Sequence, residues 1–73
     1  MGRQKVDYFT DRQKQILRCI RAAITDRGDA PTVAEIAAEV RLAPSTVHYQ
    51  LRELEAKGAI VREPHRPRGV RLA

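Results

Sequence analysis

The stretch that decides the fold is "PTVAEIAAEVRLAPSTVHYQLREL", residues 31–54. It contains two short helical patterns separated by residues 41–43, which carry no clear helical signal. In the first pattern, Thr32 precedes Glu35 by three residues, the spacing at which each side chain bonds the other's backbone amide at a helix start. The second pattern begins at Pro44, whose fixed φ suits the first turn of a helix. Two helices joined by so short a turn predict a helix-turn-helix.

The two faces of the helix that begins at Pro44 differ in character. At 100° per residue, Val47, Leu51 and Leu54 share one face, and we expect that face to be buried. The opposite face carries hydroxyls and rings, whereas a helix face that meets only water usually carries Glu, Lys, Gln and Ala. We interpret this face as a contact surface. The alternative is a polar face without a partner, on which Tyr49 lies over the edge of the core.

An upstream helix completes the helical part of the expected domain. Thr10 and Gln13 repeat the capping pattern, and apolar residues then recur at helical spacing. We expect this helix to run from Asp11 to about Arg27, with Gly28 as its stop. Gly58 is expected to end the third helix.

Beyond the third helix the pattern changes from helical to alternating. Residues 60–62 and 70–72 are expected to pair as a β-hairpin around the loop of residues 63–69. Two prolines stiffen this loop and so reduce the entropy that it would lose on docking. The sequence therefore predicts a mainly α domain with a small β-hairpin, a three-helix winged helix-turn-helix at residues 10–73, preceded by an N-terminal arm at residues 1–9.

Charge indicates the kind of partner. The 73 residues hold 14 Lys and Arg against 9 Asp and Glu, a net charge of +5. Basic side chains dominate from Lys57 onward, and such an excess is typical of proteins that meet nucleic acid. No run approaches the roughly 18 apolar residues of a membrane helix, and the start lacks the apolar core of a secretory signal. We expect a cytoplasmic protein that has no membrane partner.

Residue types argue against an enzyme. Cys19 is the single cysteine and Ser45 the single serine, while the two histidines, His48 and His65, lie far apart in sequence. There is no glycine-rich phosphate loop and no cluster with metal-ligand spacing, so we expect no cofactor, no metal and no catalytic site.

The contact face supplies the candidate base-reading residues. Ser45, Thr46, His48 and Tyr49 occupy the first turns of their helix, the part that can enter the major groove of double-stranded DNA, roughly 12 Å wide. Each offers a hydrogen-bonding group or a ring edge to the bases. Gln50 lies closer to the buried face, and whether it touches DNA is left open.

Four further side chains are assigned to the DNA backbone or to flanking positions. Arg52, one turn beyond the base-reading residues, is placed for a phosphate or a flanking guanine. Arg66, Arg68 and His65 lie in the hairpin loop, where they would meet the backbone or the adjacent minor groove.

Several motifs resemble one family. "TDRQKQILRCIRAAITDRGDAPTVAEIAAEV" (residues 10–40) and "LRELEAKGAIVREPHRPRGVRL" (residues 51–72) are similar to the DNA-binding domain of LexA, the SOS-response repressor. The Thr-x-Arg-Gln start, the Pro-Thr-x-x-Glu-Ile second helix and the Lys-Gly followed by Arg-Pro-Arg-Gly occur in that order. The resemblance implies a bacterial transcription repressor that reads operator half-sites with its third helix.

The sequence departs from the family in two respects. LexA proteins usually have a longer turn with a glycine between the second and third helices, and here we expect Arg41 to adopt a positive φ. The family's C-terminal domain, which dimerises and cleaves itself, has no counterpart in these residues. We therefore expect no self-cleavage, a monomer in isolation and a possible homodimer on DNA.

Other functions remain open from the sequence. A winged helix can be a protein-interaction module, in which Tyr49, Leu42 and the hairpin form the docking surface. RNA binding or sequence-independent DNA binding would also suit the charge. Sequence-specific binding of double-stranded DNA is the leading interpretation, because the contact face carries groups able to read bases.

Overall fold

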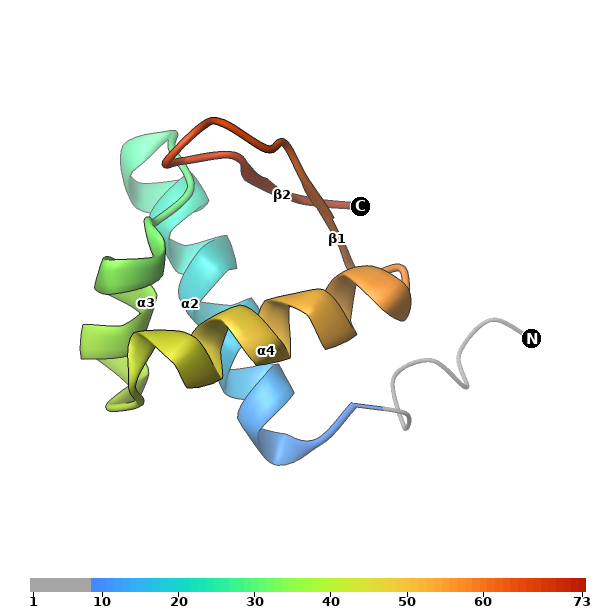
Figure 1. The fold of residues 1–73 in the computed structure, drawn as a ribbon. Helices are drawn as coiled ribbons and strands as arrows, with labels where there is room; N and C mark the ends of the chain where they lie inside the picture. Colours follow the sequence, from blue (N-terminus) through green and yellow to red (C-terminus); the bar gives the residue numbers. More distant parts are fainter. Residues whose placement is uncertain (1–8) are drawn as a thin grey trace.

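The computed structural model describes residues 9–73, and it has the predicted architecture (Figure 1). Its elements, in chain order, are α2 (Asp11–Arg27), α3 (Val33–Val40), α4 (Pro44–Ala56), β1 (Ile60–Arg62) and β2 (Val70–Leu72). The fold class, three helices and a two-stranded hairpin, is confirmed. Most of the expected N-terminal arm, residues 1–8, lies outside the described residues, and its boundary stays a prediction.

Capping boxes fix the starts of α2 and α3. The Thr10 hydroxyl accepts from the Gln13 backbone amide at 3.1 Å, and the Gln13 side chain accepts from the Thr10 amide at 3.1 Å. Thr32 and Glu35 make the same pair of bonds, at 3.1 and 3.0 Å. These bonds satisfy amides that have no partner inside the helix, so both helices begin where the sequence predicted.

The turn between α3 and α4 depends on a strained residue. Arg41 has φ 61° and ψ 48°, the left-handed conformation, which confirms the expectation from the sequence. The conformation costs about 1–2 kcal/mol for a residue with a Cβ. This conformation lets the Arg41 amide donate to the Ala37 carbonyl, and the Leu42 amide donates to the same carbonyl at 3.1 Å. The chain therefore reverses direction within residues 41–43.

All three helices and the hairpin contribute to one small core. Figure 1 shows α4 crossing in front of α2, with α3 beside its first turns and the hairpin extending above it. Every element except β2 contributes to the largest buried aliphatic side chains. Six of them are fully buried, and Ile60 of β1 is 2% exposed; the six are Ile16, Ile20, Ile36, Val47, Leu51 and Leu54. Tyr49, on the far side of α4, is 52% exposed. The predicted inward and outward faces of α4 are thus confirmed.

The hairpin forms the wing, which we define as residues 60–72. The strands pair antiparallel in the register Ile60 with Leu72 and Arg62 with Val70. The loop closes by a bond from the Glu63 amide to the Gly69 carbonyl at 2.9 Å. A Cβ at Gly69 would collide with the Glu63 carbonyl oxygen, so this close approach requires glycine.

Within residues 9–73, none of the helices is long and apolar enough to cross a membrane.

Candidate nucleic-acid interface

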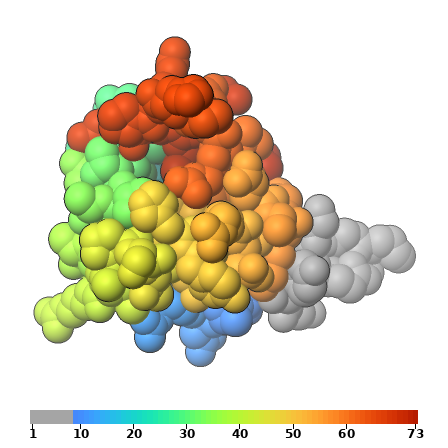
Figure 2. Space-filling model, viewed as in Figure 1, coloured from blue at the N-terminus to red at the C-terminus, as the bar shows by residue number. Residues whose placement is uncertain are grey.

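The outer face of α4 gathers the predicted base-reading side chains. Ser45, Thr46, His48 and Tyr49 are all exposed, and Arg52 one turn later is exposed as well. Figure 2 shows an exposed side of α4 at the front of the molecule, below the wing. Buried Val47 and Leu51 fix the rotation of the helix, so this face points outward. We call these five side chains the recognition face.

A groove lies between the start of α3 and the wing, and His48 of the recognition face is among the residues that line it. Its lining brings together His48 of α4, Arg62 of β1 and Arg66 of the wing loop. Arg62 was not among the residues predicted to meet DNA. The signal that could have found it is the register of β1, which places this last strand residue beside the loop rather than in the core.

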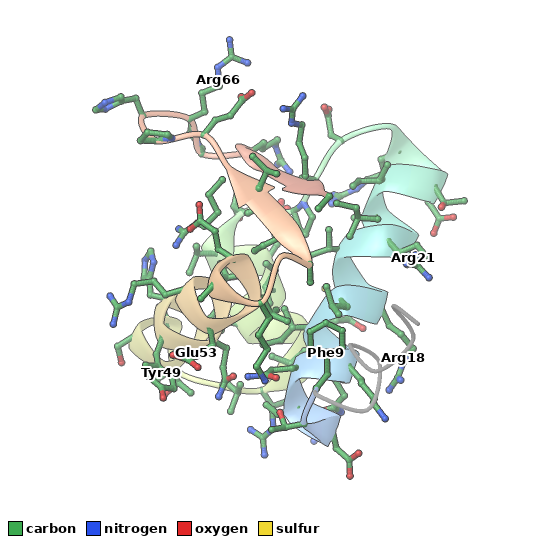
Figure 3. The ribbon with its side chains drawn as sticks, turned by 90° about the vertical axis from the view of Figure 1, so that its right-hand side faces the viewer. Phe9, Arg18, Arg21, Tyr49, Glu53 and Arg66 are labelled. Atoms are coloured by element: carbon green, nitrogen blue, oxygen red, sulfur yellow. The ribbon has the colours of Figure 1, made fainter. Side chains whose placement is uncertain are left out.

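Two of the predicted wing residues lie at its tip. Arg66 points away from the body of the domain (Figure 3), and its side chain is 74% exposed. Its nearest acidic partner is Glu63, at 3.7 Å, an exposed pairing that contributes little stability. His65 is exposed and has φ 74°. Both residues are therefore accessible to a partner that meets the wing.

Arg68 occupies a different environment from Arg66. Its guanidinium donates to both carboxylate oxygens of Glu35, at 2.9 and 3.0 Å, and to the carbonyl of Ala30 at 2.9 Å. These bonds tie the wing to the start of α3. The structure thus gives Arg68 an internal role that the sequence did not predict. Its contact with DNA stays a prediction, and it would use the guanidinium N–H groups that these three bonds leave over on a side chain that is 41% exposed.

The Arg68 hydrogen bonds and the Thr32 amide lower the pKa of the Glu35 carboxyl from its usual 4.5 to about 2. Folding therefore favours the charged carboxylate, and the stabilisation is complete above pH 4.5 and declines as the pH falls toward 2. We expect Glu35→Gln to flatten the dependence of unfolding free energy on pH in this window. Urea unfolding at several pH values measures it.

Glu39→Gln is the matched control, because Glu39 lies on the same helix and makes no ion pair with a described residue. An equal flattening in both variants would contradict the assignment to the Glu35–Arg68 pair.

Gln50, left open by the sequence, is half-buried and bonded to another element. Its Oε1 accepts from Nε2 of Gln13 at 3.0 Å. Gln13 also accepts from Nζ of Lys57 at 2.7 Å, so one side chain joins the start of α2 to Gln50 within α4 and to Lys57 directly after its end. From the sequence, Gln13 was expected only to take part in the capping box.

Charge alone does not locate the interface. Figure 3 shows Arg18 and Arg21 of α2 on the side of the molecule opposite Tyr49. What distinguishes the recognition face is the combination of hydrogen-bonding side chains on a helix with a basic wing beside it. Among the described residues, no group of three or more His, Cys, Asp and Glu side chains is arranged to hold a metal.

Comparison with known sequences identifies the family that has this arrangement. The sequence model of the LexA DNA binding domain matches residues 7–69. The chain belongs to the LexA DNA-binding domain family. The resemblance noted in the motifs is thereby confirmed, and the match includes the recognition face and most of the wing.

Known LexA repressors from mycobacteria are similar over most of this chain. The LexA repressor of Mycobacterium leprae is 50% identical over 65 residues, which are 88% of this chain and 28% of that protein. The LexA repressor of Mycolicibacterium vanbaalenii is 47% identical over 70 residues, 94% of this chain and 30% of that protein. The chain thus spans less than a third of the length of these relatives.

Proposed function

We propose that this LexA-family domain is a sequence-specific double-stranded DNA-binding module that represses transcription. The observation that carries the proposal is the division of α4, in which Val47, Leu51 and Leu54 are fully buried while Tyr49 is 52% exposed. A helix held in this way can place the polar side chains of its first turns in the major groove.

The roles differ along the interface. We assign base contacts to Ser45, Thr46, His48 and Tyr49, because they lie on the exposed part of α4 nearest its start. Contacts with the DNA backbone or flanking positions are assigned to the exposed cationic side chains around them, Arg52, Arg66 and Arg68, and to His65 at the wing tip.

NMR titration with a duplex tests the proposal. Addition of DNA at moderate salt is expected to shift the amides of residues 45–52 and 66–68. The test duplex carries an operator-like sequence, and a random duplex of the same length serves as the control. A protein that binds DNA without regard to sequence has nearly the same affinity for both duplexes. Shifts confined to α2, or equal affinity for every duplex, would contradict the proposal.

A protein-interaction module is the other candidate, and the surface supports it less well. Leu42, which such a docking surface would use, packs against the core. Large apolar side chains exposed in the described part of the chain are Tyr49 and Val61. Two such residues on different elements do not form the broad apolar patch typical of stable protein interfaces.

Arg66→Ala is expected to weaken binding to all duplexes about equally. An arginine that neutralises one phosphate contributes roughly 0.9 to the slope of log K against log salt, so the slope should fall by about that amount. Fluorescence anisotropy over a series of salt concentrations measures it. An unchanged slope with an altered base preference would show that Arg66 contacts a base.

Repression of SOS-response operators in the cytoplasm, implied by the family resemblance, is part of this proposal. Catalysis has no place in it, since DNA binding needs no reacting group. Assembly of two copies on adjacent half-sites stays a prediction. One domain contacting one half-site lacks the gain in effective concentration that a linked second domain provides.

A further inference from the structure

Gln13 is the buried polar side chain of the described residues, with 4% of its surface exposed. Its Oε1 accepts from the Thr10 backbone amide at 3.1 Å and from Nζ of Lys57 at 2.7 Å. Both partners are donors only, because a backbone amide nitrogen and an ammonium group have no acceptor capacity. The orientation of the Gln13 amide is therefore fixed, with its oxygen toward these two groups.

This orientation determines what Gln50 presents. With its oxygen occupied, Gln13 directs Nε2 toward α4, where it donates to Oε1 of Gln50 at 3.0 Å. The Gln50 amide must keep its oxygen turned inward, since its own nitrogen would otherwise face another donor. Gln50 is half-buried, and no buried side-chain nitrogen or oxygen among the described residues lacks a partner. The NH2 group of Gln50 is thus left on the accessible side of its amide.

Gln50 lies at the margin of the recognition face. At 100° per residue it stands 60° from the buried centre marked by Val47, nearer to that centre than Thr46, which lies 100° away on the same side. Side chains at the centre of the exposed face of a recognition helix reach base edges. Those at the margin of that face, near the buried side, meet the sugar-phosphate backbone that borders the groove. Phosphate oxygens accept hydrogen bonds, and an NH2 group supplies them.

We propose that Gln50 is a further DNA-binding residue, whose NH2 group donates to a backbone phosphate oxygen, and that Gln13 is the positioning residue that keeps this donor outward. The inference rests on the proposed function and assigns one more contact to the same interface. It also explains why a glutamine side chain joins α2 to α4 inside a small apolar core.

Gln50→Ala is the direct test. Loss of one hydrogen bond from an uncharged donor to a charged phosphate oxygen is expected to weaken duplex binding about 10- to 100-fold, equally for all sequences and without a change in salt slope. Gln15→Ala is the matched control, because it makes the same change at an exposed glutamine of α2, outside the recognition face. Unchanged affinity in Gln50→Ala, or an equal loss in Gln15→Ala, would overturn the proposal.

Gln13→Glu tests the positioning role. A glutamate at this position still accepts from Thr10 and Lys57, and Glu is a favoured residue in a capping box. It presents an acceptor to Gln50 in place of a donor, so the Gln50 amide should turn over and direct its oxygen toward DNA. We expect weaker binding with an unchanged melting temperature.

A double-mutant cycle separates positioning from the added charge. Any effect of the new carboxylate on DNA binding is the same whether position 50 carries its glutamine or the alanine of the Gln50→Ala variant. The loss caused by Gln13→Glu should therefore be about 10- to 100-fold larger in the presence of Gln50 than in the Gln50→Ala background. Equal losses in the two backgrounds would overturn the positioning role.

The outcomes also separate this inference from the proposed function. If the unsubstituted protein binds no duplex, both are overturned. If it binds specifically and Gln50→Ala binds as tightly, the inference alone is overturned and the recognition face stands.

Discussion

Leu51→Ala is expected to lower the free energy of unfolding by about 2–5 kcal/mol, because it removes a fully buried side chain and leaves a cavity. Leu51 lies in the centre of α4, which packs against α3 and β1. Small domains have a total stability of roughly 5–15 kcal/mol, so this loss removes a large part of it. Urea unfolding followed by circular dichroism at 222 nm measures the change.

Tyr49→Ala is the matched control for this prediction. It removes a larger side chain from the same helix, but one that is 52% exposed. We expect its effect on stability to be within about 0.5 kcal/mol, as for most surface substitutions. Comparable losses in the two variants would show that α4 is not anchored by the Leu51 face, and the assignment of the recognition face would fail with it.

The second large effect concerns base preference. His48→Ala and Tyr49→Ala are each expected to remove about 1–3 kcal/mol of discrimination at one base-pair position, because a base contact carries sequence information and a phosphate contact does not. Selection of bound sites from random DNA identifies the preferred sequence of the unsubstituted domain. Competition between that site and its single-base variants then measures the discrimination.

The variants of the flanking residues supply the comparison. Arg66→Ala and Gln50→Ala are expected to weaken every duplex alike, whereas His48→Ala and Tyr49→Ala relax one position each. Stability should be unchanged in Arg66→Ala, His48→Ala and Tyr49→Ala, since these side chains lie outside the buried core. Gln50→Ala also removes the acceptor of the buried Gln13 amide, so we expect it to lower the free energy of unfolding by about 1–3 kcal/mol. An equal loss of affinity for all duplexes in His48→Ala or Tyr49→Ala would show that the residue contacts the DNA backbone and not a base.

Local sequence signals determined where the helices begin and which faces they bury. The capping boxes at Thr10 and Thr32 and the proline at position 44 act within one helical turn, so their effects are visible without knowledge of the fold. The apolar spacing of Val47, Leu51 and Leu54 also fixes the outward side of α4, because helical geometry places the remaining residues. The positive φ of Arg41 was also expected, from comparison with the longer, glycine-containing turn of the LexA family.

Charge, by contrast, could not show which basic residues form ion pairs within the protein and which remain available to a partner. Arg66 and Arg68 are two positions apart in one loop and were assigned the same role. The structure pairs Arg68 with Glu35, 33 residues away in sequence, and leaves Arg66 extended from the wing tip. Only the packing of the wing against α3 decides between these two environments.

Gln13 and Gln50 show the same limit. The sequence by itself determined that Gln13 caps α2 and that Gln50 lies near the edge of the buried face. Their bond spans 37 residues and exists because α2 and α4 cross near the start of α2. Hydrogen bonds between distant residues depend on the direction of each group, which the spacing of residues along a chain does not specify, and so the tertiary structure alone decided which amide group of Gln50 faces outward.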